Sequence, residues 1–268
     1  MTVGVALKCR DSVVLACDSQ ATAGNYKDQA TKLERLDGYH GLIMAGSGAL
    51  CKDISERVKG YLRSEDNPTT RKIADITSEV MAGLYRGYAG KFGGSTMEDV
   101  LRLANGMPSQ LVIGGRDEND GPIIYEVSSP GIISPVENYQ PIGSGGFYAS
   151  VILKKEFVKD MHTERGQFLA TRAVVLASEM DPFVGEGFRM ATIYRPPNGY
   201  REIEGYIKKF QEMVKTAEVL RRDLDTILLH EEEGREEALA RLMDFLGAFG
   251  MGREELNKLS GIASKLRE

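Results

Sequence analysis

The chain has 268 residues, a formal net charge of −5 and a charged fraction of 27%. This balance argues against a general binder of nucleic-acid phosphates, because such proteins carry clustered excess Lys and Arg. The apolar fraction of 42% is ordinary for a soluble globular protein, and no apolar run approaches the length of a membrane-spanning helix. We therefore expect a cytoplasmic protein with neither nucleic-acid nor membrane partners.

The cysteine and histidine content limits the kinds of catalytic or metal site that the chain can form. The three cysteines form an odd set without metal-ligand spacing, which fits a reducing compartment. The three histidines, His40, His162 and His230, lie far apart in the sequence. We therefore expect no metal site, no cofactor and no Ser-His-Asp triad. The start of the chain lacks the pattern of a secretion signal, so we expect it to belong to the mature protein.

The hydrophobic pattern predicts alternating groups of strands and helices. Apolar runs at residues 3–9 and 13–17, separated by Arg10-Asp11-Ser12, predict an opening hairpin. The spacing then predicts, in chain order, strands at 33–36 and 41–45, helices at 49–63 and 70–88, strands at 111–115, 123–127 and 131–135, and helices at 147–157 and 167–180. This order predicts an α+β fold, a four-layer αββα sandwich with two antiparallel sheets between helical layers.

The character of the chain changes after Pro196-Pro197-Asn198-Gly199. Apolar residues at helical spacing predict one amphipathic helix at 200–229, and two shorter helices are predicted at 235–249 and 253–266. We therefore divide the chain into a main domain at residues 1–199 and a C-terminal helical extension at residues 200–268.

Thr2 directly follows the initiator methionine. Removal of Met1 would expose a residue that carries both a hydroxyl and a free amine. An α-amino group titrates close enough to neutral pH to accept the hydroxyl proton, so one residue can act as nucleophile and base. Threonine is common at this position, however, so the residue by itself does not indicate an enzyme.

The residues after Thr2 make this interpretation more specific. The stretch VALKCRDSVVLACDSQAT, residues 5–22, resembles the opening hairpin of proteasome β subunits, which are N-terminal nucleophile hydrolases of threonine peptidase family T1. Without a gap, the resemblance sets Thr2 on the family's catalytic threonine and Asp18 on its first aspartate. A second register sets Thr2-Val3-Gly4 on a later Thr-Val-Gly of the family. That register requires two extra residues in the hairpin and leaves no N-terminal nucleophile.

Two later motifs resemble the family's lysine and oxyanion segments. Lys32 looks like the catalytic lysine, whose ammonium would lower the pKa of the threonine hydroxyl while Asp18 holds it in place. Gly46, within Ala45-Gly46-Ser47-Gly48, looks like the glycine whose N–H faces the developing negative charge. A tight turn between strand and helix would need the same residues, so this motif also fits a purely structural role.

Two further motifs resemble the residues around the threonine amine. Ser144, within Gly143-Ser144-Gly145, would support the amine, and Asp181 resembles the family's second aspartate. The chain departs from the family at Val184, which stands where a serine usually helps to position the amine. That departure puts catalytic strength in question.

The hairpin also sets a geometric condition on the predicted site. A two-residue turn at Asp11-Ser12 would place Thr2 and Asp18 on opposite faces of the hairpin, because side chains alternate along a strand. The predicted site therefore requires a bulge or a three-residue loop at this turn.

The resemblance spans about residues 2–196 and implies a threonine-type endopeptidase that acts on peptides and proteins. It also implies self-association into a ring, with proteasome α-type subunits or an ATP-dependent unfoldase as partners. By the same resemblance, Ala21, Met44 and Gly48 would lie near the specificity pocket. Two alternatives stay open: a non-catalytic ring or scaffold subunit, and an amidase or peptide ligase like the proteasome-related connectases.

Overall fold

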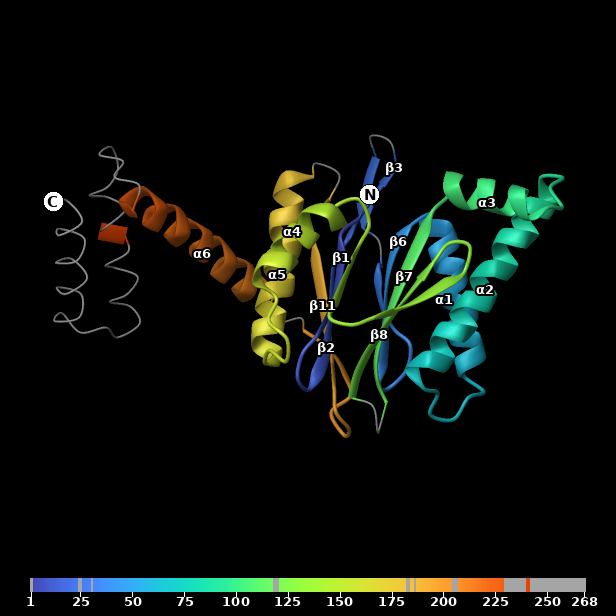
Figure 1. Ribbon diagram of the computed structural model, residues 1–268, viewed down its shortest axis with the longest axis horizontal. Helices are drawn as coiled ribbons and strands as arrows, with labels where there is room; N and C mark the ends of the chain where they lie inside the picture. The colour runs from blue at the N-terminus through green and yellow to red at the C-terminus, as the bar shows by residue number, and fades with distance from the viewer. Residues whose placement is uncertain are drawn as a thin grey trace. The chain divides into compact units, whose positions relative to one another are not determined.

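The structure is a computed structural model of the whole chain, drawn in Figure 1. It describes residues 2–23, 26–29, 31–117, 121–181, 184–185, 187–203, 207–228 and 240–241. The chain forms two compact units, Met1–Phe210 and Gln211–Glu268. The first unit contains both large sheets and helices α1 to α5, and most of helix α6 (Ile207–Leu228) belongs to the second.

The first large sheet is five-stranded and antiparallel, in the order β10-β1-β2-β11-β12. Its strands are β1 (Gly4–Lys8), β2 (Ser12–Asp18), β10 (Tyr139–Ile142), β11 (Phe188–Tyr194) and β12 (Tyr200–Glu202). Both faces of its central strands are buried, which explains why β1 and β2 read as nearly continuous apolar runs.

The second large sheet is also five-stranded and antiparallel, in the order β5-β6-β7-β8-β9. Its strands are β5 (Leu33–Arg35), β6 (His40–Gly46), β7 (Ser109–Asp117), β8 (Gly121–Ser128) and β9 (Ile132–Val136). A separate two-stranded ribbon of β3 (Gln20–Ala23) and β4 (Tyr26–Gln29) links the two large sheets along the chain.

Helices cover the outer face of each sheet. Helices α1 (Gly48–Leu62), α2 (Thr70–Lys91) and α3 (Met97–Gly106) lie on the side of the second sheet, and α4 (Gly146–Glu156) and α5 (Thr163–Met180) lie on the side of the first (Figure 1). Apolar clusters fill the space under each helical layer and between the two sheets. The predicted four-layer αββα sandwich is therefore confirmed.

The prediction of one helix across residues 200–229 is wrong at its start. Residues 200–202 form β12, which pairs with β11, and α6 begins only at Ile207. The preceding turn returns the chain to the sheet, since the Tyr194 N–H donates to the Gly199 carbonyl at 2.9 Å. Tyr200 is then buried in the apolar cluster between the sheets, where burial of a large ring outweighs helical periodicity.

The rest of the C-terminal extension lies mostly outside the described residues. The helices predicted at 235–249 and 253–266 lie outside the described residues, apart from residues 240–241. The domain boundary at 199–200 stays a prediction. Among the described helices, none has the length and apolar character needed to cross a membrane.

Candidate functional site

The opening hairpin places the start of the chain beside Asp18. Pairing between β1 and β2 is continuous over all of β1, and beyond it the Asp18 N–H donates to the Val3 carbonyl at 3.0 Å. At the other end the Cys9 N–H donates to the Ser12 carbonyl at 2.9 Å, so the chain turns within two residues. The hairpin thus lacks the bulge that the predicted site requires, and Val3, not Thr2, lies directly opposite Asp18.

Asp18 and Lys32 form a buried ion pair. The Lys32 Nζ lies 2.9 Å from Oδ1 and 2.8 Å from Oδ2 of Asp18. Asp18 is fully buried and Lys32 is 7% exposed. Burial of two charges is tolerated only where they are paired and hydrogen-bonded, so this pair is a built feature of the fold.

Backbone N–H groups complete the surroundings of the Asp18 carboxylate. Oδ1 accepts from the Val3 N–H at 2.9 Å, and Oδ2 accepts from the N–H groups of Gly185 at 3.2 Å and Gln20 at 3.3 Å. One carboxylate oxygen is therefore shared by the Lys32 ammonium and the peptide that joins Thr2 to Val3. Asp18 connects the N-terminus, the lysine and the chain that follows α5.

The Gly143-Ser144-Gly145 turn holds the carbonyl side of Thr2. Thr2 is 6% exposed, and its carbonyl accepts from the Gly145 N–H at 3.1 Å. Gly143 has φ +83°, and a Cβ there would overlap the Thr2 carbonyl oxygen, so only glycine fits without strain. Ser144 is exposed at the tip of this turn.

Gly46 ends strand β6, which pairs with β5, the strand that directly follows Lys32. Its φ is +115°, and a Cβ there would overlap the Pro108 carbonyl oxygen. Two residues earlier, the Met44 N–H donates to the Lys32 carbonyl at 2.9 Å. The structure therefore places the candidate oxyanion glycine, which is exposed, on the strand that neighbours the lysine.

Asp181 and Val184 lie where α5 returns toward the N-terminus. Asp181 is 7% exposed and follows the last turn of α5, and its carbonyl accepts from the Val184 N–H at 3.0 Å. Val184 is buried among apolar residues, and its side chain packs so close to Gly145 that a Cβ at Gly145 would lie 2.8 Å from it. Methyl groups thus occupy the place where the family resemblance leads one to expect a serine hydroxyl.

The three predicted pocket residues lie on three different elements. Ala21 is in β3, and its side chain lies outside the described part of the structure. Met44 is buried in the cluster under α1 and α2, and Gly48 is the exposed first residue of α1. Their role in specificity stays a prediction.

Sequence reasoning did not single out Gln110, which the structure places beside this turn. Its Oε1 accepts from the Gly143 N–H at 3.1 Å, and its Nε2 donates to Glu126 Oε1 at 3.4 Å. The sequence offered one indication: Gln110 is a polar residue two positions from Val112, so both share the strand face that packs in the core between the sheets.

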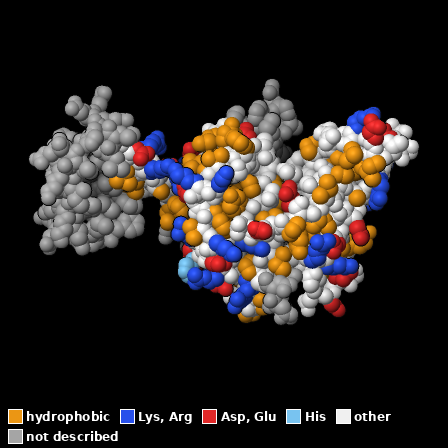
Figure 2. All heavy atoms as spheres, viewed as in Figure 1, with side chains coloured by type: hydrophobic (Ala, Val, Ile, Leu, Met, Phe, Trp, Pro, Cys, Tyr) orange, Lys and Arg blue, Asp and Glu red, His pale blue; other side chains and the backbone are white. Residues whose placement is uncertain are grey.

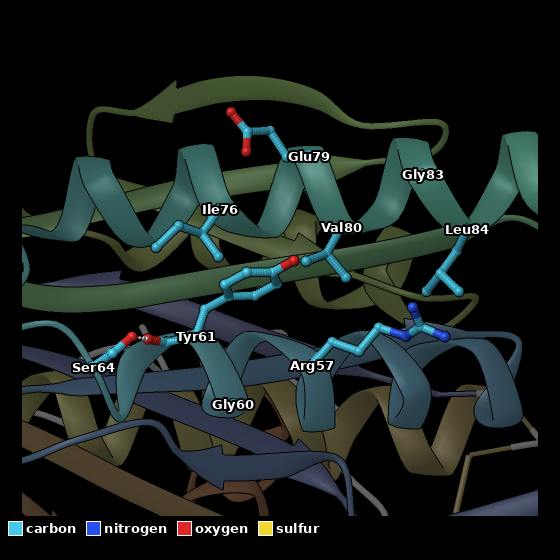
Figure 3. Close-up of a pocket in the computed structure, with 9 residues that line it drawn as sticks. All are labelled: Arg57, Gly60, Tyr61, Ser64, Ile76, Glu79, Val80, Gly83 and Leu84. Carbon is cyan, nitrogen blue, oxygen red and sulfur yellow. Dashed lines mark hydrogen bonds between the residues drawn. The ribbon is translucent and has the colours of Figure 1, made fainter.

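A groove of about 750 Å³ lies elsewhere, between α1 and α2. Figure 3 shows the Tyr61 ring of α1 extending toward Ile76 and Val80 of α2. Among the described residues that line this groove, none is one of the nine predicted site and pocket residues. We therefore assign the candidate site to the end of the sandwich where Asp18, Lys32 and the Gly143 turn meet.

Comparison with known proteins identifies the family. The family model described as "Proteasome subunit" matches residues 2–101 and 104–193. The chain belongs to the proteasome subunit family. The matched residues include all six candidate catalytic positions, and α6 lies outside them.

Three relatives carry the name of one branch of the proteasome subunit family. "Proteasome subunit beta" of Methanococcus vannielii is 30% identical over 218 residues, which are 78% of this chain and 91% of the relative. "Proteasome subunit beta 1" of Thermococcus gammatolerans is 33% identical, covering 77% and 94% of the two chains. "Proteasome subunit beta 2" of Pyrococcus furiosus is 30% identical, covering 80% and 95%.

Proposed function

We propose that the chain is a threonine-type peptidase of the proteasome β kind, with Thr2 as nucleophile after removal of Met1. The observation that carries this proposal is the shared Asp18 oxygen, which binds the Thr2–Val3 peptide and the Lys32 ammonium at the same time. A buried ammonium favours the ionised form of a neighbouring hydroxyl, because its positive charge is poorly screened in a buried site. Thr2 lies two residues before β1, in the peptide that this contact anchors.

The proposed reaction assigns one role to each candidate residue. The Thr2 Oγ attacks a peptide carbonyl while the α-amine accepts the hydroxyl proton and later delivers it to the leaving amine. Lys32 stabilises the ionised hydroxyl, and the Gly46 N–H binds the oxyanion of the tetrahedral intermediate. Water then hydrolyses the acyl-enzyme ester and restores the free threonine.

A second candidate function is a non-catalytic ring subunit. It is favoured by the hairpin register, since Val3 lies opposite Asp18 and successive side chains of a strand point to opposite faces. The Thr2 and Asp18 side chains therefore point to opposite faces of the hairpin, as an uninterrupted two-residue turn predicts. The buried Val184 also favours a non-catalytic subunit, because its side chain cannot form a hydrogen bond with the threonine amine.

Intact-mass measurement with a peptide epoxyketone separates the two candidates. This electrophile reacts with a threonine that offers both its hydroxyl and its free amine. For a peptidase we expect loss of Met1 and one adduct that maps to Thr2, absent in Thr2→Ala and unchanged in the control Thr31→Ala, where the threonine is exposed. A chain that loses Met1 but takes no adduct from epoxyketones with apolar, basic or acidic side chains would contradict the peptidase proposal.

A further inference from the structure

We infer that Gln110 is a positioning residue for Thr2, holding the Gly143 turn in place from the opposite sheet under the control of Glu126. This inference rests on the proposed function, because it assigns Gln110 a part in the reactivity of Thr2. It adds a residue pair from β7 and β8 to a site otherwise built from the N-terminus, the end of β2, the residue before β5, the end of β6 and the segments that follow β10 and α5.

The Gln110 side chain lies between the two sheets. Val112 and Ile124 belong to the apolar cluster between the sheets. Gln110 lies two residues before Val112 in β7, and Glu126 lies two residues after Ile124 in the antiparallel strand β8. Strand alternation therefore points both polar side chains toward the first sheet, where the cluster ends. The backbone of Gln110 pairs with Ala45, next to the candidate oxyanion glycine.

One hydrogen bond carries the contact across the sheets. The Gly143 N–H follows β10, the strand that pairs with β1, and it donates to Gln110 Oε1 at 3.1 Å. Gly143 in turn contacts the Thr2 carbonyl so closely that no side chain fits between them. A shift of the Gly143 turn would therefore move Thr2, and a misplacement of about 1 Å can cost a reaction on the order of a hundredfold in rate.

Glu126 sets the orientation of the Gln110 amide. Its Oε1 accepts from the amide nitrogen at 3.4 Å, which leaves the amide oxygen for the Gly143 N–H. If the amide turned over, its NH₂ group would face the Gly143 N–H, and two donors would meet. Burial raises the pKa of Glu126 above its ordinary value, although the bond from Gln110 acts in the opposite direction.

The test combines Thr2 reactivity with a measurement that does not depend on it. Gln110→Met keeps the side-chain length and removes both hydrogen bonds. We expect Gly143 amide exchange, followed by NMR of the ¹⁵N-labelled full chain, to accelerate about tenfold, as expected for one lost hydrogen bond. We expect the maximal rate of epoxyketone addition at Thr2 to fall by about tenfold or more, with little change in the half-saturating concentration.

Three further variants separate positioning from general damage. Gln140→Met makes the same change on β10, where the side chain bonds only the Pro141 carbonyl within the described residues, and should behave like the parent in both measurements. Glu126→Leu should reproduce part of the Gln110→Met effect. Glu126→Gln, which still offers an acceptor oxygen, should restore both readouts toward those of the parent.

Each outcome decides one of the two proposals. Unchanged Gly143 exchange in Gln110→Met, or a change in half-saturation alone, would overturn the positioning role even if the parent reacts. A parent that loses Met1 and takes no adduct would overturn the proposed function and the role of Gln110 in it. Faster Gly143 exchange in that case would still show that Gln110 holds the turn.

Discussion

The Asp18–Lys32 pair is the residue-scale feature with the clearest energetic consequence. Both side chains are buried, and the carboxylate accepts hydrogen bonds from three backbone N–H groups as well as from the ammonium. Removal of one partner leaves an uncompensated buried charge. The pair should therefore matter for stability whatever the protein does catalytically.

We predict that Asp18→Asn lowers the free energy of unfolding by about 3–5 kcal/mol, because Lys32 loses its counter-charge in a buried place. Urea unfolding followed by circular dichroism measures this. Glu56→Gln is the control, since Glu56 pairs with Lys52 at 3.9 Å on an exposed face of α1. That variant should change stability by less than about 1 kcal/mol. Equal small effects in both variants would contradict a buried pair.

Only glycine at position 143 should allow an unstrained contact between this turn and the Thr2 carbonyl. Gly143→Ala adds a Cβ that overlaps the Thr2 carbonyl in a left-handed conformation, φ +83°, so we predict a loss of at least about 1 kcal/mol of stability. Gly60→Ala, inside α1 with no heavy atom within 4 Å of the added Cβ, should instead stabilise by about 0.5–1 kcal/mol. Thermal unfolding of both variants reports the two signs, and stabilisation by Gly143→Ala would refute the contact.

At the scale of elements, a series of side-chain hydrogen bonds from Asp37 through His40 to Thr70 connects the β5–β6 turn to the start of α2. The His40 Nδ1 lies 2.8 Å from Asp37 Oδ2, and the Nε2 lies 3.2 Å from the Thr70 hydroxyl. Burial alone would raise the pKa of Asp37, but the hydrogen bonds from His40 and from the Tyr39 N–H outweigh it and lower that pKa below its ordinary value. Thr70 is fully buried, so its contact with His40 is shielded from solvent.

This connection predicts a pH dependence of stability. A carboxyl whose pKa is lowered by folding contributes stability above its unfolded-state pKa and loses it as the pH falls through the folded-state pKa. The melting temperature should therefore fall as the pH drops below about 4, and part of that fall should be missing in Asp37→Asn. Asp75→Asn is the control, because Asp75 pairs with Arg71 at 3.0 Å on an exposed face of α2. Parallel curves for parent and Asp37→Asn would show that the connection does not titrate.

At the scale of the whole molecule, an exposed apolar face on α4 supports the predicted self-association. Figure 2 shows hydrophobic side chains gathered over α4, where Phe147 and Val151, one helical turn apart, are 71% and 56% exposed. An apolar face that projects into solvent from an otherwise well-packed helix commonly marks a protein contact. Membership of the proteasome subunit family gives a reason to expect a ring.

We predict that Phe147→Glu lowers the assembly mass measured by size-exclusion chromatography with light scattering, because a buried charge would face the neighbouring copy. Phe92→Glu is the matched control, since Phe92 is 79% exposed at the end of α2 and lies on the other side of the sandwich. If both variants keep the parent mass, α4 is not the surface that holds the assembly.

Much of the fold could be predicted from the sequence because its central strands are buried on both faces and helices such as α1 and α2 are amphipathic. The core strands β1, β2, β6 and β7 and the helices α1 and α2 all stood out by their apolar patterns. Elements with weaker patterns, such as β10, β11 and β12, were missed or assigned to a helix. Their residues are selected by partners distant in the chain, for example Tyr200 by the cluster between the sheets.

The candidate site divides in the same way. The sequence by itself determined the residue types, since Thr2, Asp18 and Lys32 stand in an order that resembles one family. Only the tertiary structure decided which of them meet. The strand register is set by pairing along the whole hairpin. Only the structure shows that this pairing has no bulge and places Val3 opposite Asp18. The contact of Gln110 with the Gly143 turn joins two sheets, and no local pattern encodes such a contact.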